Sequence, residues 1–312
     1  MAVSEEYKKF GTTDILMILI VLFWAVNFSF LKIVFREINP LSFNGLRMFL
    51  ATIILISLLL LRGESLKIHS RDYWKILGLG VCGNTVFQLL FINGLNLSTA
   101  SNSSIIIALT PVLVALLSSF LKHEKLHLLA WAGITISFLG FYLVVSSQYG
   151  AVRFSRQGLW GDLMIFGGNI FWALYTVFSR PMLSRFTPLK LTTLTMAAGT
   201  VFFIPFCVND LVKLDFHAVS FQGWSILAYS AVFSLVIPYV VWYASVKRVG
   251  NSKTAIYDNL IPVLTIMIAY LLLDERIVPV QALGAAVILA GVYLTRSGYL
   301  LFFRRRRPGY RA

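Results

Sequence analysis

The sequence contains little charge. Only 13% of its 312 residues are Asp, Glu, Lys or Arg, whereas 58% are hydrophobic. A water-soluble domain carries about 25% charged residues, so this chain has too little polar surface to cover a globule in water. The composition excludes a soluble enzyme, a secreted disulfide scaffold and a disordered tail. It predicts a polytopic membrane protein.

Other features are scarce or missing as well. The two cysteines, Cys82 and Cys207, lie in apolar runs, so the sequence predicts no disulfide framework. The first apolar run has full membrane length and lacks a small-residue cleavage site, so we interpret it as a first span and not as a signal peptide. The phosphate-binding pattern G-x-x-x-x-G-K-[ST] is absent, which argues against ATP hydrolysis within this chain.

Long apolar runs recur along the chain. A bilayer core of roughly 30 Å needs about 20 apolar residues in a helix, and these runs lack the apolar–polar alternation of barrel strands. We therefore expect an all-α polytopic membrane protein. The runs predict ten transmembrane helices, at 14–35, 41–61, 74–95, 102–121, 128–147, 159–179, 190–208, 222–245, 252–273 and 279–299.

Lys and Arg are distributed unevenly between the loops. Ten spans put both termini on one side, and placing that side in the cytoplasm gives 20 of the 27 Lys and Arg residues to cytoplasmic segments and 5 to outer loops. This is the bias expected of inside loops. It predicts a multi-pass protein of the cytoplasmic (inner) membrane with both termini cytoplasmic. Orientation in the lipid bilayer explains most of the net charge of +14, so we expect no nucleic-acid partner.

The two halves of the chain repeat one another. Asp14 and Trp24 match Asp162 and Trp172 at an offset of 148, and Pro111 matches Pro262 at 151. Five spans per half is an odd number, so the second half enters the membrane from the opposite face. Inverted repeats of this kind are typical of secondary transporters, whose substrate site lies between the repeats. The predicted division is a cytoplasmic segment 1–13, a first repeat 14–147, an outer linker 148–158, a second repeat 159–299 and a basic cytoplasmic tail 300–312.

Short motifs in the first half, some of which also recur in the second, resemble those of a known family. They are Phe23-Trp24-Ala25-Val26-Asn27-Phe28, Lys32, Pro40 and Leu46-Arg47, then Ala100-Ser101, Thr110-Pro111, Glu124, Gly133 and Gly140. With these motifs the sequence resembles the EamA family of the drug/metabolite transporter (DMT) superfamily, over roughly 12–147 and 159–297. The resemblance implies ten helices and export of small metabolites, without specifying the substrate. The counterpart of Arg47 is Thr195, so any substrate contact made by Arg47 is asymmetric.

One motif points to different chemistry. His123-Glu124-Lys125-Leu126-His127 matches H-E-x-x-H, which on a helix can bind zinc. It lies in a short turn between two spans, and its counterpart in the second half keeps Glu275 but loses both histidines. We therefore expect no metal site, no cofactor and no enzyme. A membrane metalloprotease using His123, Glu124 and His127 is the least favoured alternative.

Asp258 is the strongest single candidate for a functional residue inside a span. An acidic residue inside a span is costly and is a functional candidate by default. Its counterpart is Ile107, so the acid does not belong to the duplicated architecture. It can bind a proton or a substrate ammonium; the alternative is an ion pair with Lys32, Arg47 or Lys253.

Other charged residues lie near the ends of spans. The matched acids Asp14 and Asp162, at the starts of spans, are expected to cap helices, and Lys32 and Arg180 are expected to snorkel.

Amides and aromatic residues on several spans suit a cavity for an amphipathic solute. The alternative is that the aromatic residues mark the membrane interface and the amides join helices. The two matched prolines are candidate hinges, with a fixed bend as the alternative. The substrate-binding candidates are Trp24, Asn27, Asn84, Gln88, Trp172, Tyr175, Tyr239, Tyr243, Tyr257 and Asp258, with Asp258 also the proton-coupling candidate and with Pro111 and Pro262 as the hinges.

These features predict a secondary transporter that exports small organic metabolites, above all amino acids or related compounds, by alternating access. We expect proton coupling through Asp258 and a monomer or homodimer. The alternatives are a facilitator, or an exchanger of another cargo such as a sugar phosphate, a nucleotide sugar or a drug. Anionic cargoes need several buried Lys or Arg, and only Lys32 and Arg47 fall inside the predicted spans.

The charge bias can be tested with reporters. A green fluorescent protein fused to the C-terminus should fluoresce and alkaline phosphatase fused there should be inactive, because the first matures in the cytoplasm and the second outside it. Both reporters fused within the outer loop 209–221 should give the reverse result. Active phosphatase at the C-terminus would contradict the predicted orientation.

Overall fold

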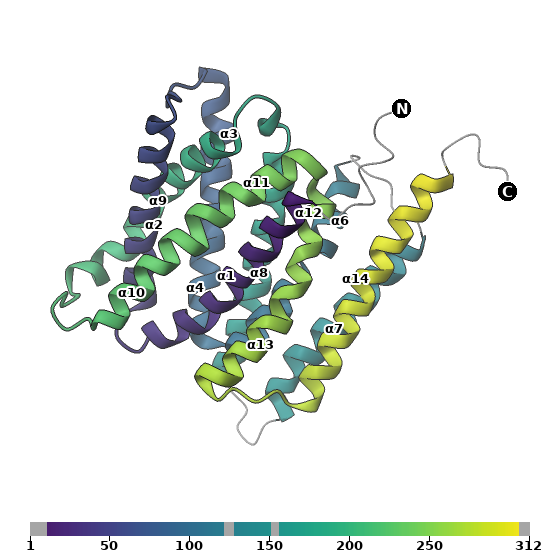
Figure 1. The fold of residues 1–312 in the computed structure, drawn as a ribbon. Coiled ribbons are helices and arrows are strands. Elements are labelled where there is room, and N and C mark those ends of the chain that lie inside the picture. Colours follow the sequence, from purple (N-terminus) through teal and green to yellow (C-terminus); the bar gives the residue numbers. More distant parts are fainter. Residues whose placement is uncertain (1–10, 122–127, 151–155, 306–312) are drawn as a thin grey trace.

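The computed structural model describes residues 11–121, 128–150 and 156–305, and every regular element in these ranges is a helix (Figure 1). In chain order the elements are α1 (Thr12–Val34), α2 (Pro40–Leu61), α3 (Ser70–Gly80), η1 (Val81–Val86), α4 (Phe87–Leu97), α5 (Ala100–Ile107), α6 (Thr110–Phe120), α7 (Leu128–Gly150), α8 (Arg156–Ser179), η2 (Met182–Ser184), α9 (Pro188–Val212), α10 (Phe221–Ser230), η3 (Ala231–Val236), α11 (Ile237–Val249), α12 (Asn251–Ala255), η4 (Ile256–Asn259), α13 (Leu260–Leu273) and α14 (Pro279–Arg305).

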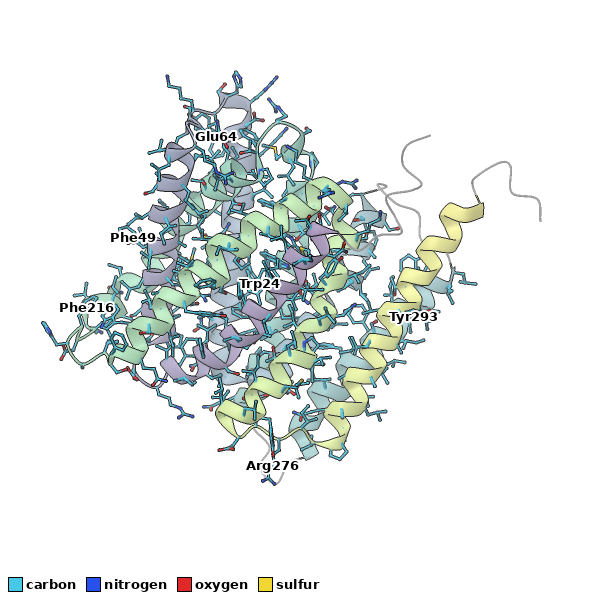
Figure 2. The ribbon with its side chains drawn as sticks, in the orientation of Figure 1. Trp24, Phe49, Glu64, Phe216, Arg276 and Tyr293 are labelled. Atoms are coloured by element: carbon cyan, nitrogen blue, oxygen red, sulfur yellow. The ribbon has the colours of Figure 1, made fainter. Side chains whose placement is uncertain are left out.

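The predicted all-helical, polytopic fold is confirmed for the described residues. Nine helical segments there are long and apolar enough to cross a membrane, and Pro279–Thr295 within α14 is a shorter apolar helix. The outer surface is apolar too: Phe49 is 58% and Tyr293 68% exposed, and Figure 2 shows both pointing outward while Trp24 lies in the middle. Such a surface suits contact with lipid tails.

Helices begin at matching places in the two halves. The Asn39 side chain accepts a hydrogen bond from the Leu41 amide (2.9 Å) just before Pro40. Thr187 accepts one from the Lys190 amide (3.1 Å) just before Pro188. A polar N-cap followed by proline at the first helical position is a strong start signal, because the missing proline N–H has no partner there in any case.

Several predicted spans are interrupted helices. The third and eighth contain π-helical segments, η1 and η3, which begin 150 residues apart. The fourth breaks between α5 and α6 just before Pro111, and the ninth changes to the 3-10 segment η4 just before Pro262. Proline lacks an N–H and clashes with the preceding turn, so the bends at the two prolines follow from sequence. Whether they move stays a prediction.

The middle of the bundle is formed by α1 and α8, and the tryptophans at matching positions in the two halves meet there. The ring centroids of Trp24 and Trp172 lie 6.0 Å apart with an interplanar angle of 90°, the edge-to-face geometry that aromatic pairs prefer. In Figure 1, α2 and α9 lie on one flank of this centre and α7 and α14 on the other.

Polar groups at the helix ends are paired across the bundle. The Lys32 ammonium donates to the carbonyls of Leu95, Asn96 and Ser98, where α4 ends (3.2, 3.2 and 2.8 Å). Asp162 does not cap its helix, because α8 begins at Arg156, so the carboxylate lies beyond the first turn. It accepts hydrogen bonds from Ser98 and Asn102 instead. Asp14 does cap α1, by accepting from the Gly11 amide (2.8 Å).

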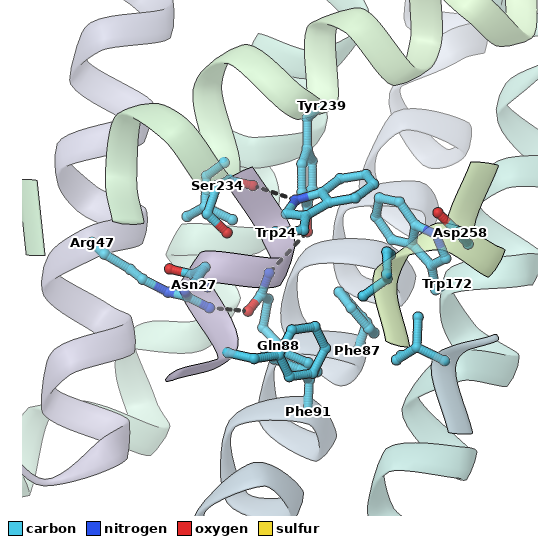
Figure 3. Close-up of a pocket in the computed structure, with 14 residues that line it drawn as sticks. Trp24, Asn27, Arg47, Phe87, Gln88, Phe91, Trp172, Ser234, Tyr239 and Asp258 are labelled. Atoms are coloured by element: carbon cyan, nitrogen blue, oxygen red, sulfur yellow. Dashed lines mark hydrogen bonds between the residues drawn. The ribbon is translucent and has the colours of Figure 1, made fainter. Parts of the chain in front are cut away.

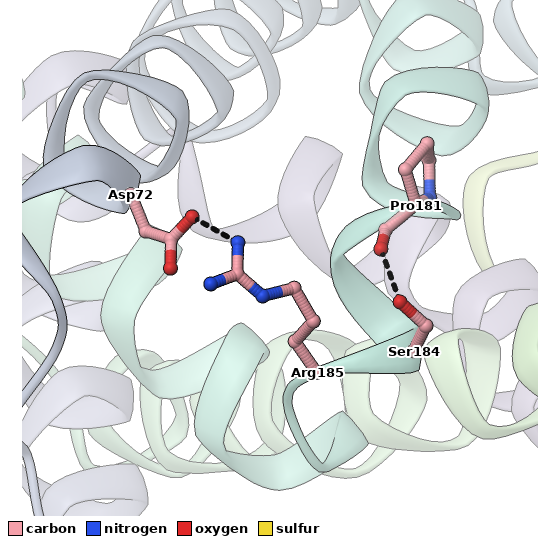
Figure 4. Close-up of polar contacts among 4 residues, drawn as sticks. All are labelled: Asp72, Pro181, Ser184 and Arg185. Carbon is pink, nitrogen blue, oxygen red and sulfur yellow. Dashed lines mark hydrogen bonds and ion pairs between the residues drawn. The ribbon is translucent and has the colours of Figure 1, made fainter.

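The two faces of the bundle are closed by matching contacts. Arg185, after η2, forms an ion pair with Asp72 on α3 (2.6 Å) (Figure 4). Glu37, its counterpart 148 residues earlier, accepts hydrogen bonds from the Ser220 amide (3.0 Å) and hydroxyl (2.9 Å) at the start of α10. In each half, the loop after the first span therefore holds the start of the other half's third span.

Glycines allow α7 and α14 to pack closely. A Cβ added at Gly291 would lie 2.4 Å from the Ser137 hydroxyl and 2.5 Å from the Gly133 carbonyl. Close backbone approach through small residues is a common way to join helices in membranes. The glycines therefore have a structural role in this helix pair.

We expect Gly291→Ala to lower stability by about 1–3 kcal/mol, the usual cost of overpacking. The apparent melting temperature in detergent should fall. Gly167→Ala is the matched control, because a Cβ there meets only Leu90 at an ordinary 3.6 Å. Equal melting temperatures for the two variants would contradict the packing argument.

Candidate functional site

A central cavity lies between the halves of the bundle, with about 500 Å³ of space not filled by atoms. Its walls come from both halves of the chain (Figure 3). The lining residues are Trp24, Asn27 and Phe28 of α1, Arg47 of α2, Phe87, Gln88 and Phe91 of α4, Ile107 of α5, Trp172 of α8, Ser234 and Leu235 of η3, Tyr239 of α11, Asp258 of η4 and Ile261 of α13.

The interrupted helices contribute to this cavity. Ser234 lies in the π-helical segment η3, and its carbonyl accepts a hydrogen bond from Trp24 Nε1 (2.9 Å). Phe87 and Gln88 directly follow η1, and Asp258 lies in η4 four residues before Pro262. Short π-helical stretches are frequent at functional sites, because the wider turn changes where the next side chains point.

Aromatic rings form much of the wall. The Trp172 ring lies 5.1 Å from Phe87, 5.1 Å from Tyr239 and 6.0 Å from Trp24, measured between centroids. Ring separations of about 4.5–7 Å are favourable packing geometry. The cavity therefore has a continuous apolar wall that can take the hydrocarbon part of a small molecule.

Arg47 brings a buried positive charge to the cavity. The residue is 1% exposed, and its guanidinium donates from Nε to Asn44 Oδ1 (2.7 Å), from Nη1 to Ser230 Oγ (2.8 Å) and from Nη2 to Gln88 Oε1 (2.7 Å). Gln88 Nε2 in turn donates to the Tyr239 hydroxyl (2.9 Å). These partners are neutral, so the network orients the charge but does not neutralise it.

Asp258 brings a buried carboxylate. It is 1% exposed, and neither of its oxygens has a hydrogen-bond partner among the described residues. The Thr110 hydroxyl is close to it, but that hydroxyl bonds the Ile107 carbonyl (2.6 Å) and Asn169 Oδ1 (2.7 Å). Within the described part of the chain no ion pair joins Asp258 to a basic residue, so the ion-pair alternative is not seen there. Figure 3 shows Asp258 and Arg47 on opposite sides of the cavity.

The structure brings six of the ten predicted substrate-binding residues to this cavity: Trp24, Asn27, Gln88, Trp172, Tyr239 and Asp258. The other four are not in its lining. Tyr175 bonds Thr195 (3.0 Å) and packs on Tyr243 with centroids 5.2 Å apart. Asn84 packs against Gly199, and Tyr257 donates to Asp14. Substrate contact by any of the ten stays a prediction.

Sequence reasoning missed part of the lining. The sequence could not single out the apolar lining residues, because 58% of the chain is hydrophobic. These residues are Phe28, Phe91, Leu235 and Ile261. Arg47 did carry one, since a charge inside a span is rare, but it was not among the predicted contacts. The His123–His127 motif lies outside the described residues.

Comparisons with known proteins agree with this architecture. The sequence model of the EamA-like transporter family matches residues 11–146 and 159–297. An uncharacterized transporter of Archaeoglobus fulgidus is 31% identical over 288 residues, which cover 91% of this chain and 97% of that protein. An Escherichia coli protein named a probable amino-acid metabolite efflux pump is 26% identical over 294 residues, 91% of this chain and 94% of its own. A solved crystal structure has a TM-score of 0.69 at 18% identity, covering 95% of this chain and 99% of its own, and shows the fold alone.

The Arg47 network can be tested by two substitutions at Gln88. Gln88→Leu removes the partner of Arg47 Nη2 and of the Tyr239 hydroxyl, and buried groups left unpaired cost about 1–3 kcal/mol. Its melting temperature should fall, whereas Gln88→Glu keeps an acceptor for Arg47 and should stay near the unaltered protein. Equal losses in both variants would contradict the network.

Proposed function

Since this chain belongs to the EamA-like transporter family, we propose that it exports amino acids or related small organic compounds by alternating access. It is a multi-pass membrane transporter and not an enzyme, as its family and relatives are. The observation that carries the proposal is the buried cavity with Arg47, Asp258 and aromatic walls. The name of the Escherichia coli relative gives further support for amino acids as cargo.

The chemistry of the cavity favours a small amphipathic molecule. Its lining is mostly apolar, with a few polar and charged groups such as Arg47, Gln88 and Asp258, and sites for small molecules have this combination. A sugar phosphate or nucleotide sugar would need several cationic contacts. Arg47 is the one Lys or Arg residue among those that line the cavity, so these anionic cargoes are disfavoured.

Alternating access follows from an inverted repeat of two five-helix halves, 14–147 and 159–299. The packing supports this arrangement, because several main contacts recur with the halves exchanged: α1 packs on α13 as α8 packs on α6, and α4 on α8 as α11 on α1. The second spans pair with one another, α2 on α9, and so do the fifth and tenth, α7 on α14. Two similar halves of opposite topology can exchange conformations, giving inward-open and outward-open states of comparable energy.

Asp258 is the residue that would couple transport to protons. It lines the cavity and lies next to the break at Pro262, so a change in that bend would alter its access to either side. Arg47 and Tyr239 lie across the cavity. Tyr257 and Lys253 are on the same span, and Asp14 on α1 bonds Tyr257. The packed helix α6 contributes Thr110 and no ionisable group.

Coupling can be tested in proteoliposomes loaded with labelled amino acids, with and without an imposed pH gradient. The unaltered protein should move cargo uphill when the gradient is present. Asp258→Asn should lose this accumulation while downhill flux remains, because an amide cannot carry a proton. Asp215→Asn is the control, since Asp215 is exposed outside the spans.

The outcomes separate the alternatives. Flux that ignores the gradient in the unaltered protein would make it a facilitator and contradict proton coupling. Absence of flux for every amino acid would contradict the cargo class while leaving the transporter fold unaffected.

A further inference from the structure

We propose that the cavity holds an α-amino acid in one orientation, with its carboxylate on Arg47, its ammonium on Asn27 and an apolar side chain against Trp172 and Phe87. The inference rests on the proposed function and deepens it by naming the substrate class: α-amino acids with apolar or aromatic side chains. It also assigns a specificity-determining role to Arg47 and separates the substrate headgroup from Asp258.

No acidic side chain pairs with Arg47 in the part of the chain that the structure describes. A guanidinium stays charged in proteins, and a buried charge with no opposite charge beside it costs several kcal/mol. The groups that Arg47 bonds are an amide of Asn44, a hydroxyl of Ser230 and an amide of Gln88. Since the side chain lines the cavity, an anionic group of the cargo can reach it and supply the missing charge.

The remaining donors of Arg47 match a carboxylate. A guanidinium has five N–H donors, and the three hydrogen bonds use one on each nitrogen. One N–H is left on Nη1 and one on Nη2. Two donors on neighbouring nitrogens meet the two oxygens of a carboxylate in parallel, the bidentate pairing for which arginine is preferred. A lysine at this position could not make that contact.

Asn27 supplies the second half of the headgroup site. The residue is 3% exposed, and its Oδ1 is buried with no hydrogen-bond partner among the described residues. An amide oxygen accepts hydrogen bonds, and the ammonium group of an amino acid is a donor of the right kind. Figure 3 shows Asn27 on the same side of the cavity as Arg47.

The aromatic wall sets the side-chain class. Beyond the headgroup site the lining includes Phe87, Phe91 and Trp172, whose rings can take an apolar side chain but offer few groups to a polar one. Tyr239 and Gln88 already bond each other. Asp258 lies on the other side of the cavity from Arg47 and Asn27 (Figure 3), so a proton on its carboxylate and a headgroup on Arg47 do not compete for one place.

The test measures binding to the purified, full-length protein with labelled phenylalanine as probe. Two competitors each lack one charge: phenylalaninamide has no carboxylate and 3-phenylpropionate has no ammonium. We expect each to bind about 10- to 100-fold more weakly than phenylalanine, because a hydrogen bond to a charged group is worth about 1.5–3 kcal/mol. Glutamate and lysine should compete poorly.

Variants assign each loss to a residue. Arg47→Gln should bring phenylalanine to the affinity of phenylalaninamide and abolish the discrimination between them, and Arg47→Lys should restore it only in part. Asn27→Leu should abolish discrimination against 3-phenylpropionate and leave that against phenylalaninamide. The controls are Arg62→Gln, at the exposed end of the same helix α2, and Asn93→Leu, an asparagine of α4 outside the cavity.

The competitor series uses the unaltered protein, so it tests whether the carboxylate and the ammonium of the cargo contribute to binding even if Arg47→Gln fails to fold. Equal binding of phenylalanine and phenylalaninamide to the unaltered protein would overturn the proposal. So would unchanged discrimination in a folded Arg47→Gln variant. Either result can occur while amino-acid flux in proteoliposomes persists, in which case the proposed function stands and only the orientation is wrong.

Discussion

Inside a bilayer there is no water to pair with, so each polar group must find its partner within the protein. Most polar side chains of this chain that lie in spans have done so. Lys32 bonds the carbonyls at the end of α4, and Asp162 accepts hydrogen bonds from Ser98 and Asn102. The first pairing joins helix ends within the first half, and the second joins the two halves. Two exceptions are informative for the same reason: among the described residues, neither oxygen of Asp258 has a hydrogen-bond partner, and Arg47 has only neutral partners.

The cavity lies where several helices are irregular. A continuous α-helix satisfies its own backbone, whereas π-helical and proline-interrupted segments change which groups point inward. Ser234 lies within η3, Gln88 directly after η1 and Asp258 within η4. The π-helical segments η1 and η3 begin 150 residues apart, so irregular helices from both halves of the chain border the cavity. The asymmetry of Arg47 and Asp258, whose counterparts are Thr195 and Ile107, gives this otherwise paired cavity one cationic and one acidic side.

Much of this could be predicted from the chain alone. The apolar runs and the absence of alternation predicted the helical membrane fold, because span length and backbone pairing are set by the bilayer. The rarity of polar residues in such runs singled out Gln88 and Asp258. Trp24 and Trp172 were predicted as substrate-binding residues, and both line the cavity. The lining by Phe91 and Ile261 could not be predicted, since one apolar residue in a span looks like another until the helix is rotated into place. Tyr175 and Tyr243 were predicted as substrate-binding residues because they are aromatic residues within spans. In the structure they pack on one another outside the cavity lining.

The sequence by itself determined the class of the protein: its helices, its membrane location, the matching positions in its two halves and the few charges that a membrane interior makes expensive. Those properties depend on composition and on short-range pattern. The tertiary structure alone decided which charges are paired. Lys32 and Arg47 are both cations within spans of the sequence. In the structure Lys32 donates to backbone carbonyls, whereas Arg47 lines the cavity. That difference arises from how helices of the two halves cross, and no local pattern encodes it.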